Sequence, residues 1–416
     1  NWDDVEVVQA PEVNTELYGR QSTGGSYTLY LNWNLMREMG ATARDMLIAA
    51  AAVTLEVPRS ELKAEGSQVI HLPTGQIRTF GQLAALAHKQ PVPDKETLVF
   101  KDREDYRILG QSISQVDSLE IVTGIGDYGI DTKVPNMLYG CYVKCPAVGG
   151  TLISVNVDEI KQAPGIVDAW AIKGNGNVRE LMDGVGIVGT DTWSVFKARQ
   201  SLEIEWDKTK ASKDSWQAFS AFAEAQGQTG DKVVVDEGSV DAAFADPDHK
   251  VLSQLYEYPY VSHLCLEPMN CTADFRTDED GRDHLELWLP TQSGPRVQDM
   301  AKSRYGLEKD QVSIHMKRMG GSFGRRTSQE YVIEAIELSK RAGRPVKLTW
   351  NREDSVRYDF LREGGFTRIK GAVDAAGKVV AIEEHVIGVA PRGTPSRFTG
   401  PWPSAFPFST MENIRA

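Results

Sequence analysis

The stretch HMKRMGGSFGRRTSQEYVIEAIELSKRAGRPVKLTW, residues 315–350, decides how the middle of the chain folds. VSIHMKRM, residues 312–319, overlaps the start of this stretch and alternates apolar and polar residues at the period of a half-buried strand. Thr327 and Glu330 have the spacing of a capping box that opens a helix, and Gly343 is placed to end that helix. VKLTW then predicts another strand. The stretch therefore predicts a strand, a glycine-rich loop, a helix and a second strand.

The glycine-rich loop has the chemistry of an anion site. Gly320, Gly321 and Gly324 allow a close approach of the backbone, whose N–H groups at a helix start attract negative charge. Arg325 and Arg326 add forked donors. The loop matches neither the dinucleotide fingerprint nor the phosphate-binding P-loop. A tight connection with solvated arginines explains the same residues about as well, so both interpretations stay open.

Composition narrows the class of protein. The chain has 416 residues, 41% of them hydrophobic and 25% charged, which is typical of a globular protein of several domains. A net charge of −12 gives no general attraction for nucleic acid. The longest apolar run, MLIAAAAVTL, is about half of the roughly 20 residues that span a bilayer. No transmembrane segment and no nucleic-acid partner are therefore predicted.

The cysteines and histidines do not predict a metal site built from side chains. Cys141 and Cys145 are spaced C-x3-C, and Cys265 and Cys271 are spaced C-x5-C, which fits neither zinc pairs nor iron–sulfur runs. Four free, mostly buried thiols are the simpler prediction. The seven histidines are scattered, and no H-E-x-x-H motif is present.

The pattern along the chain predicts an α+β fold in three regions. Residues 1–102 begin with a strand-like VEVVQA and continue into a long helical run. Residues 103–208 alternate short strands with helices, residues 209–231 are a polar linker with a short helix, and residues 232–416 are dominated by strands. The opening NWDDVEVV and the closing FSTMENIRA are what we expect of a portion of a longer polypeptide.

Four stretches, in this order, resemble the large subunit of the molybdenum hydroxylases, the xanthine dehydrogenase and aldehyde oxidase family. The resemblance is closest to the isoquinoline 1-oxidoreductase and membrane-associated aldehyde dehydrogenase branch. In the fourth stretch, 31 residues separate Gln292 from Phe323, which matches the family's spacing. The stretches begin with TGGSYTLY (from residue 23), YRILGQSI (from 106), YEYPYVSH (from 256) and LPTQSGPR (from 289).

The resemblance implies a fold and a cofactor. Residues 103–208 would be an a/b hammerhead domain, while 1–102 and 232–416 would be parts of the molybdopterin-binding domains, the latter incomplete. The metal would be molybdenum held by the dithiolene sulfurs of molybdopterin, carrying a cytosine dinucleotide. No cluster of cysteine and histidine ligands is then required.

The resemblance also implies roles for individual residues. Gln292 would hydrogen-bond a molybdenum oxo group, and Phe323 would be an exposed wall of the substrate pocket. The backbone N–H groups of Gly25 and Ser26 would approach the metal and the pyrophosphate. The glycine loop would lie against the cofactor, with its arginines neutralising pyrophosphate charge; these residues are Gly320, Gly321, Gly324, Arg325 and Arg326.

The sequence departs from the family's pattern at the catalytic base. The family uses a glutamate in a Gly-x-Gly-Glu motif, which this sequence lacks, so no catalytic residue is assigned. The family's early Gly-Gln-Gly segment is absent too. Glu267, in LEPMN, is interpreted as structural because the following proline suggests a fixed turn. Arg326 and Thr327 stand where purine oxidisers carry a substrate-binding glutamate, so xanthine is not an expected substrate.

The implied function is a molybdenum-dependent oxidoreductase that oxidises an aldehyde to a carboxylic acid or hydroxylates an N-heteroaromatic compound, with water as the oxygen donor. The implied partners are a small two-iron two-sulfur subunit, a cytochrome c subunit and the remaining part of the large subunit. The branch is commonly exported to the periplasm. Two alternatives stay open: a non-catalytic relative that serves assembly or cofactor delivery, and an anion-binding protein without a metal.

Overall fold

The computed structural model describes residues 6–226, 230, 232–388 and 410–416. It mixes helices and strands, so the predicted α+β class is confirmed. The strand expected at VEVVQA is wrong for residues 6–10, which have no regular structure. The reason is that Val7 and Val8 are exposed and pack against nothing that would hold a strand.

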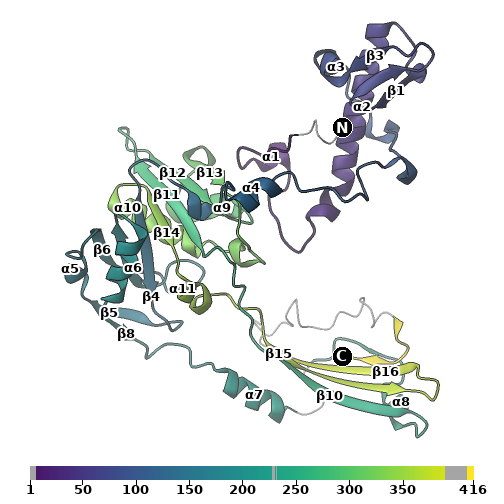
Figure 1. Ribbon diagram of the computed structural model, residues 1–416. Coiled ribbons are helices and arrows are strands. Elements are labelled where there is room, and N and C mark those ends of the chain that lie inside the picture. Colours follow the sequence, from purple (N-terminus) through teal and green to yellow (C-terminus); the bar gives the residue numbers. More distant parts are fainter. Residues whose placement is uncertain (1–5, 227–229, 231, 389–409) are drawn as a thin grey trace.

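The N-terminal unit is built on the long helix α2, Thr28–Leu55, which the sequence predicts (Figure 1). The C-terminal half of α2 packs against a three-stranded antiparallel sheet and a short helix, with Ala50, Val69 and Leu83 in the core. The N-terminal half of α2 exposes large apolar side chains. The other elements of this unit are α1 (Thr15–Tyr18), β1 (Leu62–Glu65), β2 (Gln68–His71), β3 (Ile77–Thr79) and α3 (Phe80–Ala87).

A seven-stranded mixed sheet forms the centre of the molecule, in the order β13-β12-β11-β14-β4-β7-β6. Its strands come from two of the predicted regions, since β14 pairs in parallel with β4. The predicted boundary between these regions therefore does not separate two sheets. The strands are β4 (Leu138–Lys144), β6 (Ile166–Ile172), β7 (Gly184–Gly189), β11 (Asn270–Thr277), β12 (Asp283–Leu289), β13 (Val312–Met316) and β14 (Val346–Thr349).

Helix α10, Glu330–Ala342, packs against β11 and β14 and is buried along most of its length. The predicted order of strand, loop, helix and strand is confirmed, and Gly343 ends α10 in the left-handed conformation. The predicted capping box is wrong: Gln329 precedes the helix, and the Thr327 hydroxyl donates to the Gly324 carbonyl. Glu330 cannot serve in such a box because its carboxylate binds Arg325 instead.

Smaller elements complete this part of the structure. They are α4 (Ser118–Thr123), β5 (Thr151–Val155), α5 (Val157–Ile160), α6 (Thr192–Gln200), β8 (Ile204–Asp207), α9 (Gly294–Tyr305) and α11 (Arg352–Arg357). Strands β5 and β8 pair with each other as a separate two-stranded sheet. Within the described ranges, no helix combines the length and apolar character needed to cross a bilayer.

A second sheet of five strands projects from the central body (Figure 1), in the order β10-β15-β16-β17-β9. The predicted linker holds the helix α7, whose Ala223 packs with Phe366 and Ile387 of this sheet. The elements are α7 (Trp216–Ala225), β9 (Asp236–Glu237), α8 (Val240–Ala245), β10 (Lys250–Tyr258), β15 (Gly365–Val373), β16 (Val379–Gly388) and β17 (Ile414–Arg415).

Candidate functional site

Three distant segments of the chain meet at the side chain of Gln292, which lies between β12 and α9 and is 6% exposed. Its Oε1 accepts hydrogen bonds from the Gly324 N–H at 3.0 Å and from the Ser322 hydroxyl. Its Nε2 donates to the Thr23 carbonyl at 3.0 Å. The Thr23 N–H in turn donates to the Gln292 carbonyl at 2.9 Å. Four stretches of the sequence carry the resemblance to the molybdenum hydroxylases. The structure joins the first of them, at Thr23, to Gln292 and through it to the glycine loop, which both belong to the fourth.

The glycine loop is held in an unusual backbone conformation. Gly321 and Gly324 have φ values of 100° and 104°, which favour glycine. Phe323, between them, has a φ of 55° and is 62% exposed, so its predicted exposure is confirmed. A left-handed conformation costs a non-glycine residue about 1–2 kcal/mol. The loop therefore stores strain at the residue that presents an aromatic ring to solvent.

Gly25 and Ser26 precede Tyr27, the N-cap residue of α2, and also have left-handed φ values, 62° and 57°. Within the described part of the chain, their N–H groups have no hydrogen-bond acceptor. Two free donors next to the positive end of a 28-residue helix can bind an anionic group. Gln292 binds both Thr23, two residues before Gly25, and Gly324, so this turn lies near the glycine loop.

The sequence suggests that Arg325 and Arg326 either bind an anion or are solvated. Their positions in the structure contradict both predictions. Both are buried, and each guanidinium binds carboxylates of the protein. Arg325 binds Glu330 and, through Nε, Asp359 at 3.0 Å. Burial alone would lower the pKa of Arg325, but the charges of Glu330 and Asp359 and the hydrogen bond to Glu330 together raise it, so the side chain stays cationic. The buried ion pairs of Arg325 and Arg326 therefore stabilise the glycine loop.

Glu267 is structural, as the sequence suggests. It is buried, and its Oε2 binds Arg326 at 3.0 Å and accepts the Gly320 N–H at 2.8 Å. Its Oε1 accepts the Ile130 N–H at 2.9 Å and an N–H of Asn270 at 2.8 Å. A carboxylate that receives this many hydrogen bonds fixes the loop and is not a free base. Gly320 is required here, because an added Cβ would lie 2.4 Å from that of Glu267.

The four cysteines are free and buried, as predicted. Burial raises the pKa of Cys141 to about 12 and also raises the pKa of Cys265 and Cys271, so these sulfurs are neutral thiols at neutral pH. Within the described residues, no group of three or more histidine, cysteine, aspartate or glutamate side chains is placed to hold a metal ion.

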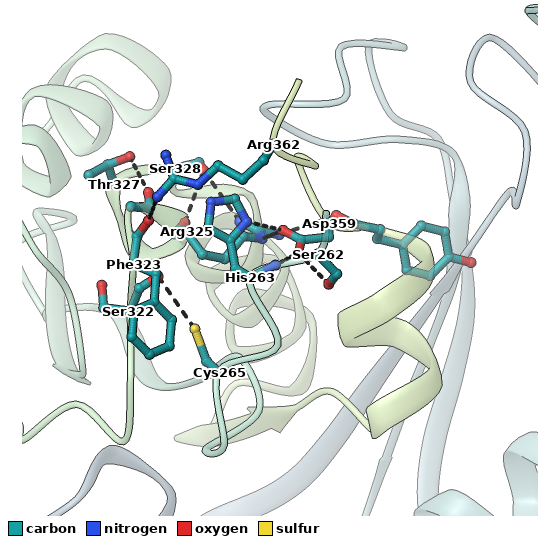
Figure 2. A network of polar contacts seen from close by, with 12 residues as sticks. Ser262, His263, Cys265, Ser322, Phe323, Arg325, Thr327, Ser328, Asp359 and Arg362 are labelled. Carbon is teal, nitrogen blue, oxygen red and sulfur yellow. Dashed lines mark hydrogen bonds and ion pairs between the residues drawn. The ribbon is translucent and has the colours of Figure 1, made fainter. Parts of the chain in front are cut away.

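Nothing in the sequence indicated a role for Asp359, which lies between α11 and β15. Figure 2 shows it within a network of polar contacts with Ser262, His263 and Arg325. Its buried carboxylate accepts hydrogen bonds from the Ser262 hydroxyl at 2.7 Å and from His263 through both the backbone N–H at 2.6 Å and Nδ1 at 2.9 Å. It also binds Arg325. Burial alone would raise the pKa of Asp359, but the hydrogen bonds from His263 and Ser262 outweigh it and lower the pKa to about 2. No spacing signal joins residues 96 positions apart.

The groups that remain fit a large anionic cofactor in part. The backbone donors of Gly25 and Ser26 suit phosphate oxygens. One N–H of the Gln292 amide is engaged by Thr23, and the second N–H finds no acceptor among the described residues, which suits a metal oxo group. The two arginine side chains do not fit, because their charge is already balanced by carboxylates. The site is thus a cradle of backbone and amide donors.

Comparisons with known proteins find similarity to molybdopterin-binding proteins. Residues 224–394, which include Gln292, Phe323 and Asp359, match a molybdopterin cofactor-binding domain. The chain is a homologue of the molybdenum hydroxylase large subunits. It is 27% identical over 431 residues to the beta chain of isoquinoline 1-oxidoreductase from Brevundimonas diminuta, and 28% identical over 377 residues to one of the subunits of nicotinate dehydrogenase from Pseudomonas putida. These matches cover 93% and 87% of the chain, and both relatives are subunits of larger enzymes.

The chain also shares its fold with solved structures. Aldehyde oxidoreductase from Desulfovibrio gigas has a TM-score of 0.54 at 18% identity, covering 81% of this chain and 40% of that protein. Quinoline 2-oxidoreductase from Pseudomonas putida 86 has a TM-score of 0.53 at 18% identity, covering 67% and 39%. The chain spans 54% of the length of the isoquinoline 1-oxidoreductase relative and 30% of the length of the nicotinate dehydrogenase relative.

Proposed function

We propose that this chain is the molybdopterin-binding part of a molybdenum hydroxylase that oxidises an aldehyde to a carboxylic acid or hydroxylates an N-heteroaromatic compound. The observation that carries the proposal is the convergence of three segments on Gln292, with one amide N–H still free to donate among the described residues. The cofactor, when bound, would supply the redox chemistry and accept the two electrons of the oxidation.

The chain's own residues bind the cofactor and orient it and the substrate. Gln292 would donate its second N–H to the oxo group of the cofactor, and this hydrogen bond would add no charge to the site. The N–H groups of Gly25 and Ser26 bind phosphate oxygens at the start of α2. Phe323 excludes water from one side of the reacting carbon. Arg325 and Arg326 hold the loop in this geometry through Glu330, Asp359 and Glu267.

The finer parts of the proposal concern cofactor, partners and location. A cytosine dinucleotide on the pterin, an iron–sulfur subunit that takes the electrons, a cytochrome c acceptor and the periplasm are supported by the resemblance of the four stretches. The identity of the nucleotide on the pterin is tested by releasing it with acid and separating the products by chromatography. Peptide mass spectrometry of the native complex tests the partners, and cell fractionation tests the location.

Activity is tested with the natively purified complex and an artificial dye as electron acceptor. Aldehydes and N-heteroaromatic compounds are screened side by side, with oxygen-18 water to establish the oxygen source. Turnover of either class with label from water supports the proposal. Molybdenum present at full occupancy with no turnover of either class would overturn the substrate assignment while leaving the cofactor assignment intact.

A further inference from the structure

Two large apolar side chains on neighbouring loops are held outward by left-handed backbone. Leu264 has a φ of 43° and is 52% exposed, and Phe323 has a φ of 55°. This conformation is unfavourable for residues other than glycine, asparagine and aspartate. Asparagine and aspartate tolerate this conformation because their side chains can hydrogen-bond to the nearby backbone. The side chains of Leu264 and Phe323 cannot form such a bond. Strain at such positions persists only where the surroundings enforce it, and it clusters at functional sites.

The residues on both sides of Leu264 are fixed by hydrogen bonds. Asp359 accepts from both the backbone N–H and Nδ1 of His263. On the other side, the Cys265 carbonyl accepts from Arg352 Nη1 at 2.7 Å. Leu264 is therefore held between two anchored neighbours while its own side chain is left exposed.

Phe323 is held in the same way. Ser322 and Gly324 both donate to the Gln292 side chain, and the Phe323 carbonyl accepts a hydrogen bond from Arg362. Two residues further on, Arg325 Nε binds Asp359. One buried carboxylate thus anchors the residue before Leu264 and a residue just after Phe323, as Figure 2 shows.

The two loops are in direct contact. The Cys265 thiol donates to the Ser322 carbonyl at 3.4 Å, and the Glu267 N–H donates to the Gly320 carbonyl at 3.0 Å. A Cβ placed on Gly321 would lie 3.3 Å from Cε2 of Phe323 and 3.5 Å from Cα of Cys265. The aromatic ring therefore lies beside the backbone that carries Leu264.

We propose that Leu264 and Phe323 are two apolar walls of one substrate pocket, and that Asp359 is the positioning residue that sets their separation. The proposal rests on the proposed function, and it names the substrate class more closely: an uncharged aldehyde or heteroaromatic compound whose body is an alkyl chain or an unsubstituted ring. Each methylene that the walls cover strengthens binding about fourfold.

The first test is Leu264→Ala in the native complex, with kcat/KM measured for straight-chain aldehydes from two to eight carbons. The walls predict a fall of about tenfold or more for the longest aldehydes, carried mainly by KM, and little change for the shortest. Leu119→Ala, which removes a side chain that is 73% exposed on α4, is the matched control. An equal change across the series, or no change, would overturn the proposal.

A binding measurement separates this inference from the proposed function. Carboxamides of two to eight carbons lack the hydrogen that the oxidation removes, and calorimetry gives their dissociation constants without turnover. Weaker binding of octanamide to the Leu264→Ala complex supports the wall even if no aldehyde is oxidised. Equal binding to both complexes, or no binding to the unaltered one, contradicts it. A shift in subunit composition instead would mean that Leu264 contacts another polypeptide, which also contradicts it.

Asp359→Asn tests the positioning role. We expect the preference for long over short aldehydes to flatten by several-fold, and the double variant with Leu264→Ala to lose little further, because both changes act on the same wall. A purely structural role would lower kcat/KM equally for all chain lengths and would add to the effect of Leu264→Ala. That second pattern would remove Asp359 from the proposal.

Discussion

The N–H of Gly324 donates to the side-chain oxygen of Gln292 at 3.0 Å, across 32 residues of sequence. This bond joins the two motifs whose spacing carries much of the resemblance to the molybdenum hydroxylases. It also orients the Gln292 amide, since the oxygen is occupied by the loop and the nitrogen is turned toward Thr23. The same Gln292 side chain therefore fixes the geometry of the glycine loop and the direction of its own second amide N–H.

Gln292→Ala should loosen the glycine loop without unfolding the chain. The Gly324 N–H and the Ser322 hydroxyl lose their acceptor, and a lost buried acceptor costs about 1–3 kcal/mol locally. Hydrogen exchange read by mass spectrometry on a peptide containing residues 320–326 should speed up by about tenfold or more. Gln298→Ala, which removes a single hydrogen bond to the Val13 carbonyl, is the control. Unchanged exchange in the loop would contradict this account.

Glu267→Gln should destabilise the protein strongly, because it leaves the buried guanidinium of Arg326 without its counter-charge. Breaking a buried ion pair from one side costs about 3–5 kcal/mol. Asp45→Asn breaks the exposed pair between Asp45 and Arg59, and should cost less than about 1 kcal/mol. Urea unfolding of the two variants compares these effects. Similar losses in both would show that the Glu267 pair does not hold the loop.

Gly320→Ala and Gly81→Ala should act in opposite directions. The first places a Cβ against Glu267 and should cost about 1–3 kcal/mol through overpacking. The second adds a Cβ to α3, where nothing lies within 4 Å, and should stabilise the helix by about 0.5–1 kcal/mol. Thermal unfolding of both variants is the measurement. A Gly320→Ala protein as stable as the parent would mean that Glu267 has room to move.

Asp359 should make stability depend on pH in acid. Its pKa in the folded protein is about 2, below its ordinary value of 3.8. A carboxyl whose pKa is lowered by folding contributes stability that is present above the ordinary value and is lost as the pH falls toward the lowered one. The stability difference between the parent and Asp359→Asn should therefore be largest above about pH 4 and shrink toward pH 2.

Urea unfolding midpoints between pH 2 and pH 6 check this, with Asp299→Asn, an exposed aspartate of α9, as the control for removing one carboxylate. A difference that stays constant over that range would mean that the Asp359 network is not an ionic one.

Local signals in the sequence were sufficient for the elements around the site. The alternation in β13, the glycine after α10 and the alternating VKLT of β14 each act within a few residues, and all three elements are confirmed. The capping box failed because Glu330 has a stronger partner in Arg325. No capping-box spacing rule accounts for that competition.

The burial of the two arginines could not be predicted for a related reason. Glu267 lies 59 positions before Arg326, and Asp359 lies 34 positions after Arg325, so neither ion pair leaves a periodic trace in the sequence. Composition and motif spacing identify arginines near an anion-binding loop, but only the folded chain shows which way their side chains turn. The exposure of Phe323, in contrast, was expected from the resemblance.

The most direct test of the central claim is the molybdenum content of the natively purified complex, measured by inductively coupled plasma mass spectrometry together with the mass of each co-purifying chain. The account predicts about one molybdenum for each copy of this chain, lost in parallel with the pterin on acid release. A complex that contains neither molybdenum nor pterin would contradict it, and would leave Gln292 and the glycine loop as structural features of a fold without its cofactor.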